Sequence, residues 1–233
     1  MLLRQISLAF ILSVLALSCS KDSTDFKSDS ANIKFSIITQ GGNSFSKSSN
    51  AQVDSLTLTS VRVVIDGIEF ESTAEDSLDF ELEEPFVQDL NVSGTLHPID
   101  NVSVPFGEYD EMEIEIDRLK SEDGQVYLDN PELQNQSIRV EGYLDGDTSN
   151  TFLFLSQMEV EQEFEFDTPL VLDETSPSTN VVLEVDLSTW FVDGSNQLVN
   201  PSDSGNKSLI ENNIKNSFYV FEDENDDGEE DDD

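Results

Sequence analysis

Hydrophobic residues alternate with carboxylates along several short stretches of this chain, and this pattern most constrains its fold. The clearest run covers residues 112–117, with the sequence Met-Glu-Ile-Glu-Ile-Asp, and residues 164–167 and 181–187 repeat it. Successive side chains of a strand point to opposite faces, so each run would bury one face and expose the other. The alternation therefore predicts half-buried β-strands.

Five further stretches have a similar apolar pattern: residues 33–39, 61–71, 86–92, 138–144 and 152–155. Prolines and Asp-Gly pairs separate these stretches at intervals typical of short strands. We therefore expect an all-β fold, an antiparallel β-sandwich of about eight or more strands with one C-terminal helix.

The stretch 61–71 contains an irregularity. Val61, Val63 and Ile65 lie at odd positions, whereas Ile68 and Phe70 lie at even positions, and Asp66-Gly67 lies between the two sets. A change of parity moves the buried side chains to the other face of a strand. The sequence predicts either a tight hairpin or a β-bulge at this point.

The C-terminal helix is predicted from a capping pattern and a periodicity. Ser208 and Glu211 have the spacing of a capping box, in which each side chain bonds a free backbone amide of the first turn. Ile210, Ile214 and Phe218 follow at intervals of four residues, which would place them on one helix face.

The first twenty residues suggest an export signal. One positive charge at Arg4 precedes a mostly apolar run over residues 6–17, which is shorter than the roughly 20 residues needed to span a bilayer. The run ends in Leu15-Ala16-Leu17-Ser18-Cys19, which resembles the lipobox of bacterial lipoproteins. The resemblance implies lipidation of Cys19 and cleavage just before it; the alternative is an ordinary secretory peptide with an incidental cysteine.

These features divide the chain into four parts. We expect a signal peptide at 1–18, a flexible polar tether at 19–30, a β-sandwich domain at 31–221 and an acidic tail at 222–233. Cys19 is the single cysteine, so no internal disulfide can form. The lipid anchor implies attachment to the outer membrane, with the domain on its periplasmic or its extracellular face.

The charge of the chain restricts its partners. Asp and Glu number 50 against 11 Lys and Arg, for a net charge of −39 at pH 7, and most acidic residues precede the tail. Such a surface repels nucleic acid and attracts cations and basic partners, so nucleic-acid binding is excluded. The acidity could equally serve only to keep an exported protein soluble.

A candidate metal site lies in the tail. Residues 223–231 follow the pattern D-x-N-x-D-G-x-x-D, which resembles the calcium loops of thrombospondin type 3 repeats and dockerins. The resemblance implies Ca²⁺ ligands at Asp223, Asn225, Asp227, Glu229 (through its carbonyl) and Asp231, with Gly228 at the sharp turn. The acidic residue expected at position twelve would follow the last residue of the chain. The alternative is a disordered polyanion that collects cations loosely.

Catalytic patterns are weak. The single histidine, His97, precedes Pro98 in a predicted turn, and one histidine without a reactive cysteine cannot build the common Ser-His-Asp, Cys-His or histidine-rich zinc sites. A glycoside hydrolase needs only two carboxylates, and their abundance here makes that pattern uninformative. We assign no catalytic residue and expect no enzyme activity.

Trp190 and Phe191 allow two interpretations. On a strand the two rings would point to opposite faces, so one could stack on a sugar while the other packs in the core. Packing of Trp190 in the core is the favoured interpretation.

The pattern as a whole resembles that of uncharacterised single-domain β-sandwich lipoproteins of Gram-negative bacteria. The resemblance is found at residues 104–109 (Val-Pro-Phe-Gly-Glu-Tyr) and 185–191 (Val-Asp-Leu-Ser-Thr-Trp-Phe). It implies the fold but no activity. The leading hypothesis is a non-enzymatic envelope or surface lipoprotein that acts as a binding or structural module, with calcium as its candidate cofactor and a glycan or protein as its candidate ligand. The alternative is a carbohydrate-binding component of an uptake system or a glycoside hydrolase.

Overall fold

The computed structural model describes residues 30–46, 51–73, 79–82, 84–90 and 92–230. The predicted signal peptide, Cys19, nearly all of the tether and Asp231 lie outside the described residues. No helix among the residues described is long and apolar enough to cross a membrane.

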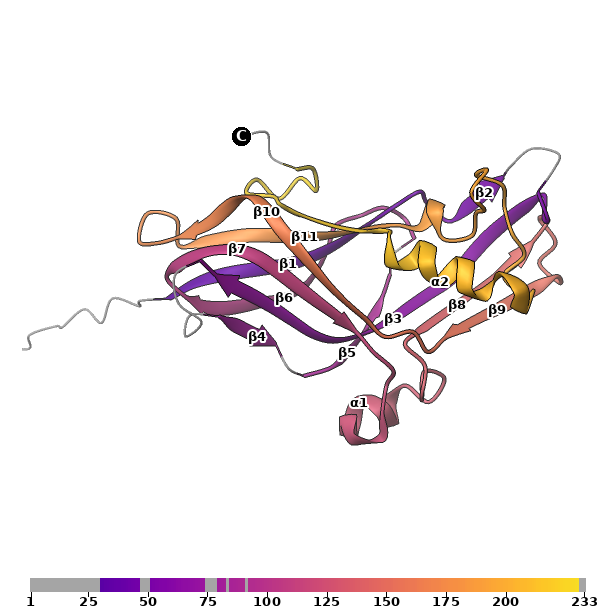
Figure 1. Ribbon diagram of the computed structural model, residues 1–233, viewed down its shortest axis with the longest axis horizontal. Helices are drawn as coiled ribbons and strands as arrows, with labels where there is room; N and C mark the ends of the chain where they lie inside the picture. Colours follow the sequence, from indigo (N-terminus) through magenta and orange to yellow (C-terminus); the bar gives the residue numbers. More distant parts are fainter. Residues whose placement is uncertain (1–29, 47–50, 74–78, 83, 91, 231–233) are drawn as a thin grey trace, which may run out of the picture.

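The described chain forms two β-sheets, so the predicted all-β sandwich is confirmed (Figure 1). The smaller sheet has four strands in the order β12 (Phe218–Glu222), β11 (Ser178–Asp186), β1 (Ser30–Gln40) and β6 (His97–Pro105). The larger sheet has the order β10 (Val160–Leu172), β7 (Gly107–Ile116), β3 (Ser55–Ser72), β8 (Ile138–Leu144) and β9 (Thr151–Ser156). Three short strands also pair with β3: β2 (Ser44–Ser46), β4 (Phe80–Leu82) and β5 (Phe86–Asp89).

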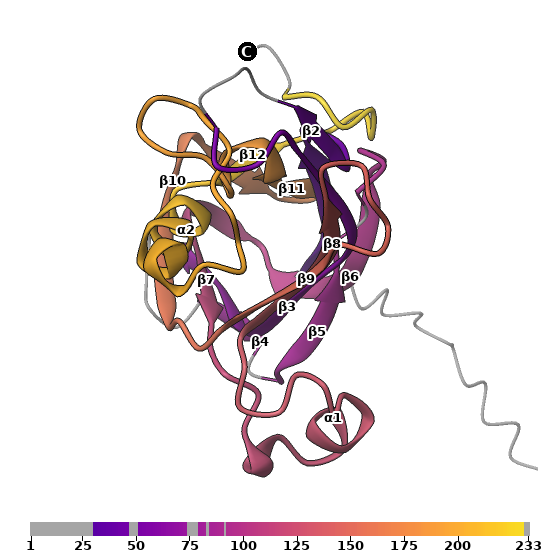
Figure 2. The same ribbon diagram turned by 90° about the vertical axis from the view of Figure 1, so that its right-hand side faces the viewer.

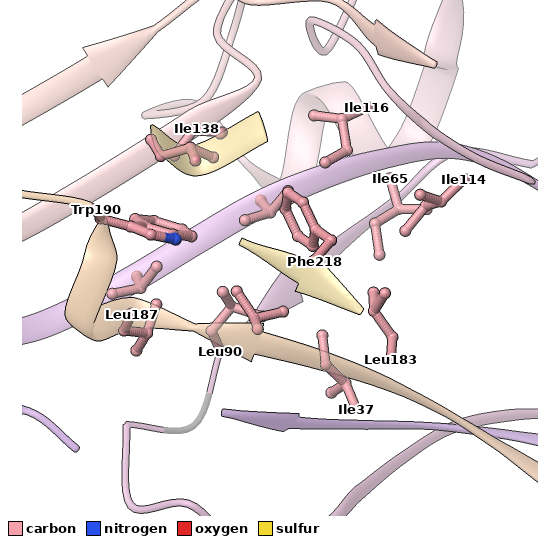
Figure 3. Close-up of a cluster of buried hydrophobic side chains, with 14 of the residues drawn as sticks. Ile37, Ile65, Leu90, Ile114, Ile116, Ile138, Leu183, Leu187, Trp190 and Phe218 are labelled. Atoms are coloured by element: carbon pink, nitrogen blue, oxygen red, sulfur yellow. The ribbon is translucent and has the colours of Figure 1, made fainter. Parts of the chain in front are cut away.

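The core lies between the two sheets and contains the apolar half of each alternating run. Ile114 and Ile116 of β7 face Ile37 of β1 and Leu183 of β11 across this core (Figure 3). Each such side chain contributes about 1.5–3 kcal/mol when it is fully removed from water. The carboxylates between them on β7 therefore lie on the outer face of the larger sheet.

The strand pairing differs from the prediction at one place. β1 and β11 are parallel, with Phe35 opposite Val181, whereas the other strand pairs of the described chain are antiparallel. Parallel neighbours need a long connection, and more than one hundred residues separate β1 from β11. No local pattern in the sequence specifies so distant a partner.

The irregularity at Asp66-Gly67 is a β-bulge and not a hairpin. β3 continues through it, and its pairing with β7 shifts between Ile65 and Gly67. Both Ile65 and Ile68 are buried as a result, although they differ in parity. The bulge lies where the pairing partner of β3 changes, from β8 up to Val63 to β7 from Ile65 onward.

The predicted C-terminal helix is α2 (Lys207–Lys215), and it is shorter than expected. Ile210 and Ile214 are buried against the sheets as predicted, but Phe218 belongs to the next strand, β12. The helix ends before Phe218 because Asn216 and Ser217 form a turn that leads into β12. A second short helix, α1 (Gly124–Asp129), was not expected and projects from the sheets (Figures 1 and 2).

Trp190 and Phe191 both lie in the core. Their exposed fractions are 0% and 1%, because they follow a short 3₁₀ turn (Leu187–Thr189) and not a strand. The indole Nε1 of Trp190 donates to Ser217 Oγ at 2.7 Å, which satisfies its buried donor. The core interpretation of Trp190 is therefore confirmed. His97 was expected in a turn but begins strand β6, where it is exposed.

Gly142 on β8 is required by a close approach of neighbouring chain. A Cβ atom at this position would lie 2.1 Å from the Thr57 carbonyl oxygen and 2.6 Å from a ring carbon of Phe152. We expect Gly142→Ala to lower the free energy of unfolding by about 1–3 kcal/mol, measured by urea denaturation. Gly194→Ala is the matched control, because nothing lies within 4 Å of its added Cβ. Equal stability of the two variants would contradict the packing described.

Candidate functional site

The outer face of the larger sheet is covered by glutamates. They come from three neighbouring strands, β10, β7 and β3, because each alternating run turns its polar residues outward. We call the following set the carboxylate face: Glu69, Glu71, Glu111, Glu113, Glu115, Glu161, Glu163 and Glu165.

The strand register places like charges directly opposite one another. Glu113 of β7 lies opposite Glu163 of β10 on one side and Glu69 of β3 on the other. Glu111 is likewise between Glu165 and Glu71. Directly opposed like charges destabilise a sheet, by roughly 0.2–1 kcal/mol per pair. A cation bound to this face would relieve that repulsion.

This repulsion also affects protonation. Burial and then the neighbouring carboxylates Glu161, Glu69 and Glu163 raise the pKa of Glu113 above its ordinary 4.5. The pKa of Glu111 is raised in the same way, by burial first and then by Glu71 and other carboxylates. The ionised face is therefore less favourable in the folded chain than the same groups are in water.

One part of the carboxylate face could hold a metal ion. Ligand oxygens of Glu113, Glu161 and Glu163 all lie within 4.8 Å of one another. Within the described part of the chain, no lysine or arginine forms a salt bridge with these three residues. Oxygen ligands of this type suit a hard divalent cation.

A second cluster, Asp66, Glu115 and Asp117, is also close enough for a metal ion but has its own cations. The Lys120 Nζ lies 2.5 Å from Asp117 Oδ2, and the Arg118 Nε lies 3.8 Å from Asp117 Oδ1. The hydrogen bond to Asp117 raises the pKa of Lys120, so its ammonium stays charged. Lys120 would therefore compete with a metal ion for the carboxylates of this second cluster, but it does not pair with the cluster at Glu113.

Four of the five predicted calcium ligands lie in a folded loop, residues 223–230, which we call the C-terminal loop. It follows β12 directly and turns through two residues of left-handed conformation, Asp226 (φ 61°) and Gly228 (φ 79°). Glycine tolerates this conformation readily, and aspartate is among the few other residues that adopt it.

The carboxylate of Asp223 organises the C-terminal loop. It is completely buried, and its oxygens accept hydrogen bonds from the Asp227 amide at 3.0 Å and the Gly228 amide at 2.9 Å. The side-chain amide of Asn180 on β11 donates to the same carboxylate at 3.3 Å. Three N–H donors thus compensate its burial.

Of the five predicted ligands, Asp223 contacts the backbone of Asp227 through one of these bonds. Glu229 is next to them, because its amide donates to Asp227 Oδ1 at 2.9 Å. Asn225 belongs to the same turn, and Asp231 lies outside the described residues.

The C-terminal loop is held against the outer face of the smaller sheet. Lys34 Nζ on β1 lies 2.5 Å from Asp226 Oδ1, and the Tyr219 hydroxyl donates to Glu230 Oε1 at 2.9 Å. Gly228 is buried, and an added Cβ would lie 3.2 Å from Ile38 Cδ1.

Sequence reasoning missed this packing, although one signal was present. Val181, Val182 and Leu183 of β11 are consecutive apolar residues, which indicates a strand covered on both faces. Val182 points away from the main core and forms a small apolar cluster with Ile38, Phe221 and Leu96.

The aromatic site considered for glycans is not formed by Trp190. Its indole is fully buried, so it has no face on which a sugar could stack.

Comparison with known proteins gives little guidance. No protein-family model matches the chain, and no curated protein matches it. A solved structure of MbnP from Methylosinus trichosporium is similar, with a TM-score of 0.39 and 12% identity over 75% of this chain and 81% of that chain. A likeness this distant carries no argument about ligand or activity.

The raised pKa of Glu113 has a consequence for stability. Since this pKa is higher in the folded than in the unfolded chain, ionisation weakens the fold: the cost is complete above the raised pKa and disappears as the pH falls through it toward 4.5. We expect Glu113→Gln to raise the free energy of unfolding near neutral pH by about 0.2–1 kcal/mol, with a smaller gain near pH 4.5. Urea denaturation at a series of pH values would measure this.

Glu108→Gln is the matched control for this measurement. It removes the same charge from the same strand, but Glu108 lies opposite Val171 and not opposite a carboxylate. An equal gain in both variants would mean that total charge, and not the register of the carboxylate face, sets the effect.

Proposed function

We propose that this protein is a calcium-binding module displayed outside the cytoplasm on a lipid anchor at Cys19, with a structural or binding role and no catalytic one. The C-terminal loop is the proposed calcium site. The carboxylate face is a second, weaker region for cations.

The observation that carries this proposal is the fold of the C-terminal loop around Asp223. A tail this acidic can match the pattern D-x-N-x-D-G by chance. A chance match alone, however, would not predict that these residues fold into a compact turn. Here the first Asp of the pattern is buried and accepts amide hydrogen bonds from the fifth and sixth positions. The backbone of Asp227 is thereby held against the Asp223 carboxylate, directly after strand β12.

The chemistry of these groups suits calcium. Ca²⁺ takes six to eight oxygen ligands, and an ionised carboxylate has about four acceptor positions. Asp223 accepts three N–H hydrogen bonds, so about one acceptor position is left for an ion. Asp227, the Asn225 side chain, the Glu229 carbonyl and Asp231 are the proposed remaining ligands, with water completing the shell.

The proposed location rests on the sequence. The leader and the Leu15–Cys19 motif support export and lipidation, and the polar tether gives the domain reach from a membrane. Two acyl chains at one cysteine are enough for stable membrane attachment. Attachment to the outer membrane, on either of its faces, fits these features.

Calcium titration of two single-charge variants tests the calcium site. We expect saturable binding by the wild-type protein in isothermal calorimetry and a higher melting temperature with calcium, because an ion that binds the folded state stabilises it. Asp227→Asn should weaken binding about ten-fold or more, since a lost ligand costs at least as much as a lost outer-shell partner.

Asp226→Asn is the matched control. It removes the same charge from the same loop, but Asp226 pairs with Lys34 and is not a proposed ligand. If the two variants weaken binding equally, calcium responds only to the charge of the tail, and the site proposal fails. Absence of saturable calcium binding in the wild-type protein would also contradict the site proposal.

The lipid anchor has a separate test in cells. We expect Cys19→Ala to abolish incorporation of labelled fatty acid and to move the protein from the detergent phase to the aqueous phase in phase partitioning. Ser23→Ala, within the tether, should leave both unchanged. Continued labelling of Cys19→Ala would rule out lipidation at this residue.

A further inference from the structure

β10 and β12 approach each other at neighbouring edges of the two sheets, and a groove lies between them. β10 pairs with β7 at Glu165 and again at Leu170, but only one residue of β7, Asp110, lies between the two partners. Residues 166–169 therefore bulge away from the larger sheet. They form one wall of the groove, and Tyr219 to Glu222 of β12 and Glu230 of the C-terminal loop form the other.

The groove has a volume of about 220 Å³ and a lining of two kinds. Glu165, Asp167, Glu222 and Glu230 are its acidic lining residues, and Phe166, Tyr219, Val220 and Phe221 are its apolar ones. No lysine, arginine or histidine of the described chain lines it. Anionic ligands are therefore repelled, and cations are attracted.

Tyr219 presents an accessible ring to this groove. Its exposed fraction is 47%, and its ring centroid lies 6.0 Å from that of Phe221. The hydroxyl donates to Glu230 at 2.9 Å, which fixes the ring between the strand and the C-terminal loop. That hydrogen bond, burial and the carboxylates of Glu230 and Asp167 raise the pKa of Tyr219, so its hydroxyl remains protonated.

The spacing of the carboxylates favours an organic cation over a metal ion. No three of the four groove carboxylates have oxygens within 4.8 Å of one another, in contrast to Glu113 and its neighbours. A metal ion needs several ligands at 2–3 Å and would not find them here. A cation on an apolar stem can contact a ring and reach separate carboxylates at once.

We propose that this groove binds a lysine side chain on an extended segment of a partner protein. A lysine provides four methylene groups for the rings and three N–H donors that can point to separate carboxylates. Arginine fits less well, because its planar fork suits one bidentate carboxylate, and these carboxylates come from separate chain segments. β12 lies at the edge of its sheet, so an extended segment can lie alongside it.

The test uses an otherwise uncharged peptide with one central lysine, in EDTA so that the outcome does not depend on the proposed calcium site. We expect saturable binding to the full protein, with a dissociation constant roughly in the millimolar range, measured by NMR or calorimetry. Tyr219→Leu and Asp167→Asn should each weaken it by roughly two- to five-fold, the expected contribution of one ring or one carboxylate at an exposed site. Asp167 is exposed and Tyr219 is 47% exposed, so the fold should be retained.

Three comparisons decide the outcome. Asp173→Asn removes an exposed carboxylate outside the groove and should leave the affinity for the peptide unchanged. If it lowers the affinity as much as Asp167→Asn does, the peptide is attracted by the acidic surface in general and not by the groove. The same peptide with acetyl-lysine should not bind, and binding would show that the ammonium is not recognised. Free butylamine should bind more weakly than the peptide; equal affinity would overturn the peptide partner in favour of a small amine.

Discussion

Burial of one face of each alternating strand is the constraint on which the rest of this structure depends. With Ile114 and Ile116 in the core, the glutamates between them must lie outside, and the same holds for β10 and β3. The hydrophobic core and the carboxylate face are thus two results of one sequence period. A shift of one residue in any of these strands would exchange them, so the acidity of the outer face is as strongly fixed as the core itself.

Local patterns in the sequence were sufficient for the fold class and for several details. The alternation at residues 112–117 and the packing of Trp190 depend on neighbouring residues, and both were predicted. The irregularity at Gly67 was also located, with a β-bulge as one of two alternatives. The errors lie where distant segments compete with a local pattern. Phe218 continues the helical spacing of Ile214, but pairing with Val185 of β11 places it in a strand instead.

For the candidate sites as well, residue types were predictable from the sequence, whereas contacts between distant segments were not. The loop pattern beginning at Asp223 is visible in the sequence, yet its packing depends on Asn180 and Lys34, which lie far away along the chain. Likewise, the abundance of glutamates was evident, but only the pairing of β7 with both β10 and β3 places Glu113 between Glu163 and Glu69. The presence of many glutamates was therefore predictable, whereas their proximity on one face depends on the register of three strands.

The position of β1 has a mechanical consequence. It is the first strand described after the proposed tether, yet it is central in its sheet, with parallel β11 on one side and antiparallel β6 on the other. If the chain is anchored at Cys19, any pull between the membrane and a bound partner enters the domain along the axis of β1. Such a force must shear two hydrogen-bond ladders together and cannot open them one bond at a time, so the domain would resist extraction from its anchored end.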